Sequence, residues 1–422
     1  MTGRMVSETS KPSSDILSSN QSTSNYFNIN PFKSIGTTVK VTEIPLKKIM
    51  MKNDLKGKLS LKSQIKAESD YHARRKPRPC GLTVHPGIGC TNRCIYCYIQ
   101  DMGFSFTKIT PYGLTGRELA YALLSNPFFY PTRQGTYIAI GSITEPFHQK
   151  IKEKTMQYLL SISRLGNPIQ FSTKEHIDRE TARVMARLKS PISPLITITT
   201  IHRREILEPQ APPIYRRLQT IRNLKREGMK PMLFLRPIIP GITDVEIDEI
   251  IGEAKHAGVI GVVIGGLRIT RNIIERMRRK GIDVEEIMRR LKGKKLSNRQ
   301  IYVGMRDLKE KIVEVVRENG LKIFKSACCA TAYVSETPCI NICWEGQICT
   351  KCNNKCVEKI PEITLEEIGH LTKMIIGRET KKIVRKKYET TIYIEKIAKS
   401  KVEILKYGLQ VLLRNRIRIR FI

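Results

Sequence analysis

The chain has 422 residues, a length that allows one large domain with additions or two to three smaller domains. Its 74 Lys and Arg outnumber 39 Asp and Glu, which gives a formal net charge of +35. A hydrophobic fraction of 41% permits a sizeable core and excludes a wholly disordered basic chain. No apolar run reaches the roughly 18 residues of a membrane span, and the first residues lack an export signal. We therefore expect a cytoplasmic protein with no membrane partner.

The excess of positive charge predicts an affinity for phosphate polyanions, whose counterions are released when lysine and arginine bind them. Heat adaptation enriches acids and bases together, so it does not explain bases at nearly twice the number of acids. A generally basic proteome with no specific partner is the alternative. Nucleic acid is therefore a candidate partner.

Composition divides the chain into four segments. Residues 1–79 form an N-terminal extension, expected to be disordered up to about Asn28 and to end in a basic run that wraps the next domain or binds polyanion. Residues 80–325 hold a domain with its following helices, and residues 326–358 are rich in cysteine. Residues 359–422 are a basic C-terminal extension, and its last alternating residues predict a strand with arginines at 414, 416, 418 and 420 on one face.

Short β-rich apolar runs alternate with helical patterns from about residue 80 to residue 265. The candidate strands are 81–85, 136–141, 168–173, 195–200, 231–236 and 259–265. The candidate helices are 117–125, 151–164, 178–188, 214–227 and 243–257, and the last begins with the capping box Thr243-Asp244-Val245-Glu246. This alternation predicts an α/β fold with a parallel sheet, either open or closed into a barrel. Residues 266–325 are predicted to be helical and basic.

All eleven cysteines lie in two clusters, and in a chain expected inside the cell such clustering favours metal ligation over disulfides. In the first cluster, Cys90, Cys94 and Cys97 have the spacing C-x3-C-x2-C directly after the first candidate strand. Three thiolates bind only three irons of a [4Fe–4S] cube, so the fourth iron is left open for another ligand. A zinc site completed by His85 or Cys80 is the alternative.

This triplet, with Tyr96 inside it, resembles the radical S-adenosylmethionine (radical SAM) superfamily. In that superfamily SAM chelates the open iron, an electron from the cluster cleaves the sulfonium, and the resulting 5′-deoxyadenosyl radical abstracts a substrate hydrogen. The resemblance implies a partial (β/α)6 TIM-like barrel with a [4Fe–4S] cluster on the triplet. It also implies SAM as a cofactor and a reductant protein such as ferredoxin or flavodoxin.

Four further motifs resemble the spore photoproduct lyase-like branch, often labelled "DNA repair photolyase". They are Gly141-Ser142-Ile143-Thr144-Glu145-Pro146-Phe147, Phe171-Ser172-Thr173-Lys174, Leu207-Glu208-Pro209-Gln210-Ala211-Pro212 and Arg236-Pro237-Ile238-Ile239-Pro240-Gly241-Ile242-Thr243-Asp244. The repair lyase donates a hydrogen atom from a cysteine in its barrel, whereas this chain has no cysteine between Cys97 and Cys328. This departure argues against thymine-dimer repair. Tyr96 and Tyr98 are the remaining candidate hydrogen or electron relays, with packing over the cluster as the alternative.

The motifs fall at or just past the C-terminal ends of candidate strands, which form the functional rim of a barrel. Candidate cofactor contacts there are a glycine for close backbone approach, hydroxyls for the methionyl end and the sugar, a cation for the SAM carboxylate, and an orienting carboxylate. The glycine is Gly141, and the hydroxyls are those of Ser142 and Thr199. The cation is Lys174 and the carboxylate is Glu145. Local backbone capping, or a solvated surface position for the lysine, is the alternative.

The second cysteine cluster offers close spacings that suit ligands on tight turns around one metal centre. Its candidate metal ligands are Cys339, Cys343, Cys349, Cys352 and Cys356, preceded by Cys328 and Cys329. An auxiliary [4Fe–4S] cluster is the favoured interpretation, with zinc and redox-active disulfides as alternatives. A short zinc knuckle would also suit nucleic-acid recognition.

The leading hypothesis is a radical SAM enzyme that acts on nucleic acid or a nucleotide-containing substrate. One alternative is a radical SAM enzyme that modifies a peptide or protein and uses the second cysteine cluster as an electron conduit or substrate ligand. Another is a non-enzymatic, metal-stabilised nucleic-acid-binding protein. The substrate, the bond broken and the oligomeric state are not fixed by the sequence.

Overall fold

The computed structural model describes residues 39–78, 81–339, 354–386 and 389–422, and Lys40–Ile422 form one compact unit. The stretch that the sequence predicts to be disordered lies outside the described residues. So do four of the cysteines: Cys80, Cys343, Cys349 and Cys352.

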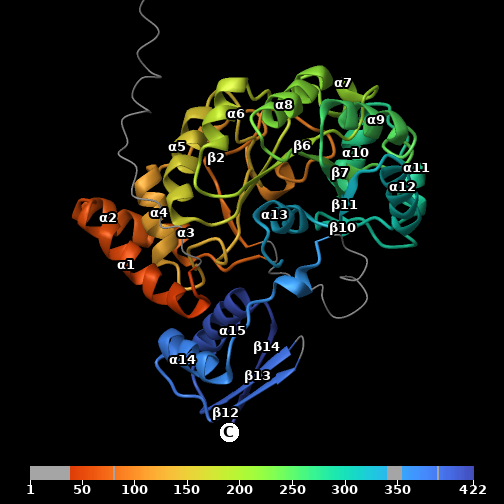
Figure 1. The fold of residues 1–422 in the computed structure, drawn as a ribbon. Coiled ribbons are helices and arrows are strands. Elements are labelled where there is room, and N and C mark those ends of the chain that lie inside the picture. The colour runs from red at the N-terminus through yellow and green to blue at the C-terminus, as the bar shows by residue number, and fades with distance from the viewer. Residues whose placement is uncertain (1–38, 79–80, 340–353, 387–388) are drawn as a thin grey trace, which may run out of the picture. The chain divides into compact units, whose positions relative to one another are not determined.

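A seven-stranded parallel sheet forms the centre of the unit, in the order β1-β4-β5-β6-β7-β8-β11 (Figure 1). Its strands are β1 (Leu82–Val84), β4 (Ile138–Ile140), β5 (Ile169–Thr173), β6 (Ile192–Thr197), β7 (Met232–Ile238), β8 (Gly261–Gly266) and β11 (Lys322–Phe324). The sheet confirms the α/β partial-barrel prediction, and each of the six expected strands is present. Strand β11 is an addition, because the sequence predicted only helix in that region.

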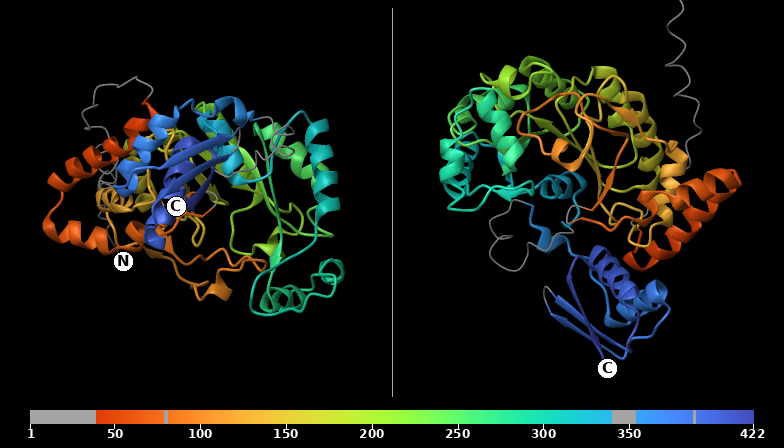
Figure 2. Two further views of the ribbon diagram at one scale, coloured as in Figure 1. Left: turned by 90° about the horizontal axis from the view of Figure 1, so that it is seen from below. Right: turned by 180° about the vertical axis from the view of Figure 1, so that it is seen from behind.

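Helices connect the strands and form the outer layer of the barrel (Figures 1 and 2). They are α4 (Gly116–Ser125), α5 (Lys152–Ile162), α6 (Arg179–Ala186), α7 (Arg204–Leu207), α8 (Ile214–Arg226), α9 (Ile247–Ala257), α10 (Arg271–Arg279), α11 (Glu285–Arg289) and α12 (Arg306–Glu318). Helix α4 shows why these segments form: a capping box between Thr115 and Glu118 satisfies its first amides, and its apolar residues are buried against the sheet.

The capping box predicted at residue 243 is wrong, because α9 begins at Ile247. The hydroxyl of Thr243 instead donates to the carbonyl of Thr199 at 2.7 Å. The carboxylate of Glu246 accepts a hydrogen bond from Thr200 at 2.9 Å. Both side chains therefore join the loops that follow β6 and β7, a tertiary role that the local pattern does not reveal.

The described part of the N-terminal extension packs on α4, as the wrapping prediction requires. It consists of α1 (Ile44–Gly57), α2 (Leu61–Ser69) and α3 (Tyr71–Arg74). Tyr121 of α4 donates a hydrogen bond to Glu68 at 2.9 Å, and Lys66 forms an ion pair with Glu118 at 3.1 Å.

The C-terminal extension folds into a small three-stranded sheet backed by two helices. Its elements are α14 (Leu365–Ile376), β12 (Lys382–Lys386), β13 (Glu389–Ile394), α15 (Lys399–Leu413) and β14 (Arg416–Phe421). Strand β13 is antiparallel to β12 and parallel to β14. The predicted face of four arginines is partly wrong: Arg416, Arg418 and Arg420 are exposed on β14, whereas Arg414 ends α15 in a left-handed conformation and is fully buried.

Helix α13 (Ala327–Ser335) lies on the inner face of the large sheet, near the amino ends of its strands. It packs against apolar side chains of four strands: Leu195, Met232, Val263 and Phe324. The remaining small elements are β2 (Gly87–Ile88), β3 (Thr110–Pro111), β9 (Arg268–Ile269), β10 (Ile301–Tyr302) and the short 3-10 helices η2 (Val41–Glu43), η3 (Gln100–Met102), η4 (Ser163–Leu165) and η6 (Cys356–Lys359). Among the described residues, no helix has the length and apolar character to cross a bilayer.

Candidate active site

The first cysteine triplet lies on the loop that follows β1 and β2, on the carboxyl side of the large sheet. Cys94 is buried, and Cys90 and Cys97 are partly exposed. The loop is held to the segment after β6 by backbone hydrogen bonds, from the amide of Ile95 to the carbonyl of Leu207 at 2.9 Å and from Gln210 to Asn92 at 3.3 Å. The loop conformation is therefore set by a segment more than a hundred residues away in the chain.

An arginine of α10 also fixes this loop. Arg276 donates from Nε to the carbonyl of Ile95 at 3.1 Å and from Nη2 to the carbonyl of Cys97 at 2.8 Å. The carboxylate of Asp101, which accepts from Thr270 at 2.7 Å, lies 3.4 Å from the Arg276 guanidinium. Sequence reasoning read Arg276 only as part of a basic run, so it missed this positioning role.

Burial and nearby charges set the pKa values of the three thiols. Burial raises the pKa of Cys90 to about 12 and also raises the pKa values of Cys94 and Cys97. The positive charge of Lys174 acts in the opposite direction on all three thiols. Three thiols on one loop, on which the charge of a lysine acts, are the donor set of an iron–sulfur cluster, whose irons bind cysteine as the thiolate. These residues therefore fit the implied cluster.

Lys174 belongs to a buried charge network that follows β5 and β6. Its Nζ lies 3.9 Å from Oε1 of Glu208 and 5.7 Å from the ring centre of Tyr96. Arg217 of α8 pairs with the other oxygen of Glu208 at 2.5 Å, and both side chains are fully buried. Thr199 donates to Glu208 at 3.0 Å, and the Tyr96 hydroxyl donates to the same carboxylate.

Electrostatics keep this network charged in spite of its burial. Burial by itself raises the pKa of Glu208, but the charges of Arg217 and Lys174 outweigh it and lower that pKa below its usual range. Burial lowers the pKa of Lys174, but the negative charges of Cys94 and Glu208 raise it above its ordinary value. Burial and the charge of Glu208 raise the pKa of Tyr96. Lys174 is thus held as a cation beside the cysteine loop.

A second buried carboxylate joins the loops after β4 and β5. Glu145 accepts hydrogen bonds from the amide of Lys174 at 3.0 Å and from the hydroxyl of Thr173. Burial raises its pKa. Glu145 therefore fixes the backbone of Lys174, and the ligand-orienting role that the sequence suggested for it stays a prediction.

The remaining residues that the sequence predicted at the site differ in their burial and in their contacts. Gly141 has a positive φ, and a Cβ there would lie 3.0 Å from Pro146 and 3.1 Å from the Ser172 carbonyl oxygen, so packing within the protein already favours glycine, and its contact with a cofactor stays a prediction. Ser142 is exposed. Tyr98 is partly buried and packs against the main core. The hydroxyl of Thr199 is used within the network described above.

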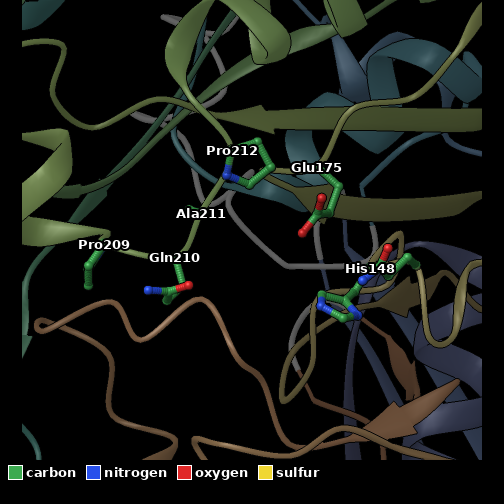
Figure 3. A pocket seen from close by; sticks show the side chains of 7 residues that line it. His148, Glu175, Pro209, Gln210, Ala211 and Pro212 are labelled. Atoms are coloured by element: carbon green, nitrogen blue, oxygen red, sulfur yellow. The ribbon is translucent and has the colours of Figure 1, made fainter.

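A cavity of about 320 Å³ opens between the loop that carries His148 and the proline-rich stretch that follows α7 (Figure 3). It is lined by His148, Gln149, Glu175 and the stretch 209–212, so the predicted proline-rich loop does border an opening. His148 lies 3.1 Å from the hydroxyl of Thr91, inside the cysteine loop. Burial and the charge of Glu145 raise the pKa of Glu175 to about 8. The opening is thus polar and adjoins the cysteines.

Residues 84–254 match the family model described as the radical SAM superfamily. This segment is a radical SAM domain. It contains the triplet, Lys174, Glu208 and Arg217, and the superfamily implies a [4Fe–4S] cluster and SAM at that site. The domain supports an enzyme, and it leaves the reaction open.

Similar proteins include one viral protein and two proteins of known structure. An uncharacterised protein, ORF301, of Acidianus two-tailed virus is 22% identical over 205 residues, which cover 42% of this chain and 67% of that protein. A mutant of spore photoproduct lyase with bound AdoMet and dinucleoside spore photoproduct is 16% identical with a TM-score of 0.43, over 56% of this chain and 72% of that chain. SuiB of Streptococcus suis, bound to S-adenosylmethionine, is 13% identical with a TM-score of 0.41, over 61% of this chain and 52% of that chain.

Sequence reasoning missed Glu208 and Arg217, the buried pair that supports Lys174. One signal was present, because Glu208 is the acidic residue of a proline-rich motif that closely follows a strand. His85, which the sequence offered as a fourth ligand, has its Nε2 2.8 Å from Nη1 of Arg75. Of the second cysteine cluster, Cys339 and Cys356 are described and buried, whereas Cys343, Cys349 and Cys352 lie outside the described residues.

Proposed function

We propose that this chain reductively cleaves SAM at the first cysteine triplet and uses the resulting radical on nucleic acid or a nucleotide-containing substrate. A [4Fe–4S] cluster on Cys90, Cys94 and Cys97 would supply the electron that cleaves the sulfonium of bound SAM. The observation that carries this proposal is the position of Lys174, a largely buried cation 5.7 Å from the ring centre of Tyr96, which lies within the triplet, and its charge acts on the pKa values of all three thiols. A reductant protein such as ferredoxin or flavodoxin would deliver the electron, and a reducing compartment such as the cytoplasm would protect the thiols.

The chain's own residues bind and position the cofactor in this proposal. Lys174 offers its ammonium to the SAM carboxylate, and Glu208 with Arg217 keeps that ammonium charged and in place. Arg276 fixes the carbonyls of the cysteine loop, so that the three sulfurs keep one arrangement. Tyr96 and Tyr98 stay predictions as radical relays, and the hydrogen bond from Tyr96 to Glu208 gives the former a positioning role as well.

The C-terminal sheet supports a polyanionic substrate. The strand registers place three rows on its open face: Lys382 with Tyr393 and Arg420, Val384 with Thr391 and Arg418, and Lys386 with Glu389 and Arg416. The other face is buried under the helices through Ile392, Ile394 and Ile417. Five cations around one partly exposed tyrosine are a surface on which phosphates pair and a base can stack.

The position of the second cysteine cluster argues against a peptide modifier that ligates its substrate there. Helix α13, which carries Cys328 and Cys329, donates from Thr331 to Gln170 near the start of β5 at 2.6 Å. Lys174 follows the other end of that strand, about 13 Å further along at the rise of an extended chain. Because Cys328 and Cys329 lie in the same helix as Thr331, this contact favours a structural role for these two cysteines over a substrate site beside the triplet.

The test is SAM cleavage by the anaerobically reconstituted, reduced full chain. We expect 5′-deoxyadenosine from the wild-type protein and none from Cys94→Ala, which also loses the iron of the triplet. Single-stranded and duplex oligonucleotides should bind with an affinity that falls steeply with salt, and should change the yield of 5′-deoxyadenosine. Cleavage without any salt-dependent binding would refute the substrate, and iron-loaded protein that never cleaves SAM would refute the reaction.

A further inference from the structure

The second cysteine cluster brings three thiols together in a place that the proposed reaction does not use. Cys328 and Cys329 are the second and third residues of α13, and Cys339 follows a few residues after that helix. All three are buried, and their sulfurs lie within 4.8 Å of one another. Sequence reasoning placed Cys339 in a ligand set with later cysteines, whereas the fold places it beside the two earlier ones.

The distance between the sulfurs distinguishes a single ion from an iron–sulfur cube. On a tetrahedral zinc ion with Zn–S bonds of about 2.3 Å, two sulfurs are separated by about 3.8 Å. On a cube each cysteine binds a different iron, so its sulfurs lie further apart than they do around one shared ion. Separations within 4.8 Å therefore favour a single ion at these three cysteines.

The local backbone suits negatively charged sulfur. The cysteines occupy the first turn of α13, where helical amides point outward and stabilise a thiolate. The hydroxyl of Ser326, at the start of the helix, lies 3.1 Å from the sulfur of Cys328 and 3.0 Å from that of Cys329. Asn354 donates to the carbonyl of Cys329 at 2.6 Å and brings the chain near Cys356 back to this helix.

A buried arginine provides independent support for an anionic site. Arg414 donates from Nη2 to the carbonyls of Gln134 and Gly135, at 2.6 Å and 2.9 Å. Its Nε and Nη1 have no hydrogen-bond partner among the described residues, although the side chain is fully buried. The guanidinium lies 5.1 Å from the ring centre of Tyr137, and burial lowers the pKa of Arg414, whereas Tyr137, Cys339, Tyr407 and Cys356 act to raise it. A buried guanidinium needs such a counter-charge, and a divalent ion with three or four thiolates carries a net negative charge.

We propose that Cys328, Cys329 and Cys339 bind one thiophilic divalent cation of the Zn²⁺ class, with Arg414 as the counter-charge. Each thiol releases its proton as it binds the metal. Arg414 ends α15, so the metal also ties the C-terminal sheet to the amino ends of the barrel strands. The site is structural and does not depend on the reaction proposed above.

Metal analysis of single-cysteine variants tests the site. We expect about one zinc per chain in the wild-type protein and in Cys94→Ser, which has lost the iron of the first triplet. Cys329→Ser should lose the zinc and keep that iron. Iron with a [4Fe–4S] absorption that persists in Cys94→Ser would overturn the single-ion assignment, as would a disulfide between the two helix cysteines or the absence of any metal.

Two measurements cover the case in which Cys329→Ser does not fold. Cobalt(II) added to metal-stripped Cys94→Ser should show thiolate-to-cobalt charge transfer and the intense visible bands of tetrahedral cobalt, and their absence would refute the site. In competition with a chelator, Arg414→Met should bind zinc with an affinity about 10- to 100-fold lower than that of the wild type. This is the usual effect of removing a partner of metal ligands. Arg416→Met, exposed two residues later, is the matched control, and equal zinc affinities in both variants would refute the counter-charge.

Discussion

The buried pair of Glu208 and Arg217 is the feature of the active site whose energetic role is most directly testable. Replacing Glu208 with Gln keeps the shape of the side chain and an oxygen for the hydrogen bonds from Tyr96 and Thr199. It removes the charge that faces Arg217 at 2.5 Å, where both side chains are fully buried. The arginine is then an uncompensated buried cation, which is the costly outcome of breaking such a pair.

The expected loss of stability follows from that burial. Removing one partner of a buried ion pair destabilises a protein by about 3–5 kcal/mol. For a unit of this size, about 2 °C of melting temperature corresponds to 1 kcal/mol, so Glu208→Gln should unfold about 6–10 °C earlier. Removing both charges in Glu208→Gln with Arg217→Met should restore part of the loss, because Arg217 no longer remains as an uncompensated buried cation, whereas Lys174 still lacks its partner Glu208.

Thermal unfolding of the four proteins of this double-mutant cycle is the assay, with a surface pair as the control. Glu310→Gln breaks the pair of Arg306 and Glu310, whose side chains are 92% and 63% exposed. Such exposed pairs contribute about 0.5 kcal/mol, so the control should melt within about 1 °C of the wild type. If Glu208→Gln melts with the control, or if the double variant is no more stable than Glu208→Gln, the buried-pair reasoning is wrong.

Three further predictions concern the cofactor, pH and nucleic acid. Lys174→Met should weaken SAM binding in equilibrium titrations by about 10-fold or more and leave the iron content unchanged. An unaltered SAM affinity would show that Lys174 does not bind the cofactor. Because the pKa of Glu175 is raised, its carboxyl group stays protonated in the folded protein up to about pH 8. In the unfolded chain the same group loses its proton near pH 4.5. Stability should therefore fall as pH rises through that window, by about 1–2 kcal/mol between pH 6 and pH 8 after allowance for partial exposure, and Glu175→Gln should lack this component in denaturant titrations. Replacing Arg416, Arg418 and Arg420 with Gln should make the salt dependence of oligonucleotide binding shallower by up to about 3 in log–log slope without altering SAM cleavage, and an unchanged slope would move the nucleic-acid surface elsewhere.

Local patterns were sufficient for much of the barrel. Buried parallel strands are short, apolar and β-branched, so their runs predicted all six expected strands, and the helices between them have a clear apolar face. Two local predictions failed, one at the start of α9 and one at β11. Thr243 and Glu246 form a good local capping pattern, but tertiary hydrogen bonds to the loop after β6 use both side chains. Strand β11 has three residues and little periodicity to detect.

The active site also has one part that local sequence predicted and one part that it did not. The spacing of Cys90, Cys94 and Cys97 is a local property of one loop, so the sequence by itself predicted the triplet and its chemistry. The support of Lys174 by Glu208 and Arg217 joins three segments that follow different strands, and no local pattern records such a meeting.

The second cysteine cluster shows the limit of spacing most directly. The sequence predicted that these thiols bind a metal as a group, but it favoured a cube and a ligand set that begins at Cys339. Only the tertiary structure brings the sulfur of Cys339 within 4.8 Å of those of Cys328 and Cys329, and only it buries Arg414. Chain spacing limits how far apart two residues can be, whereas packing of the whole chain decides which charges meet, and the chemistry of a buried site depends on the charges that meet there.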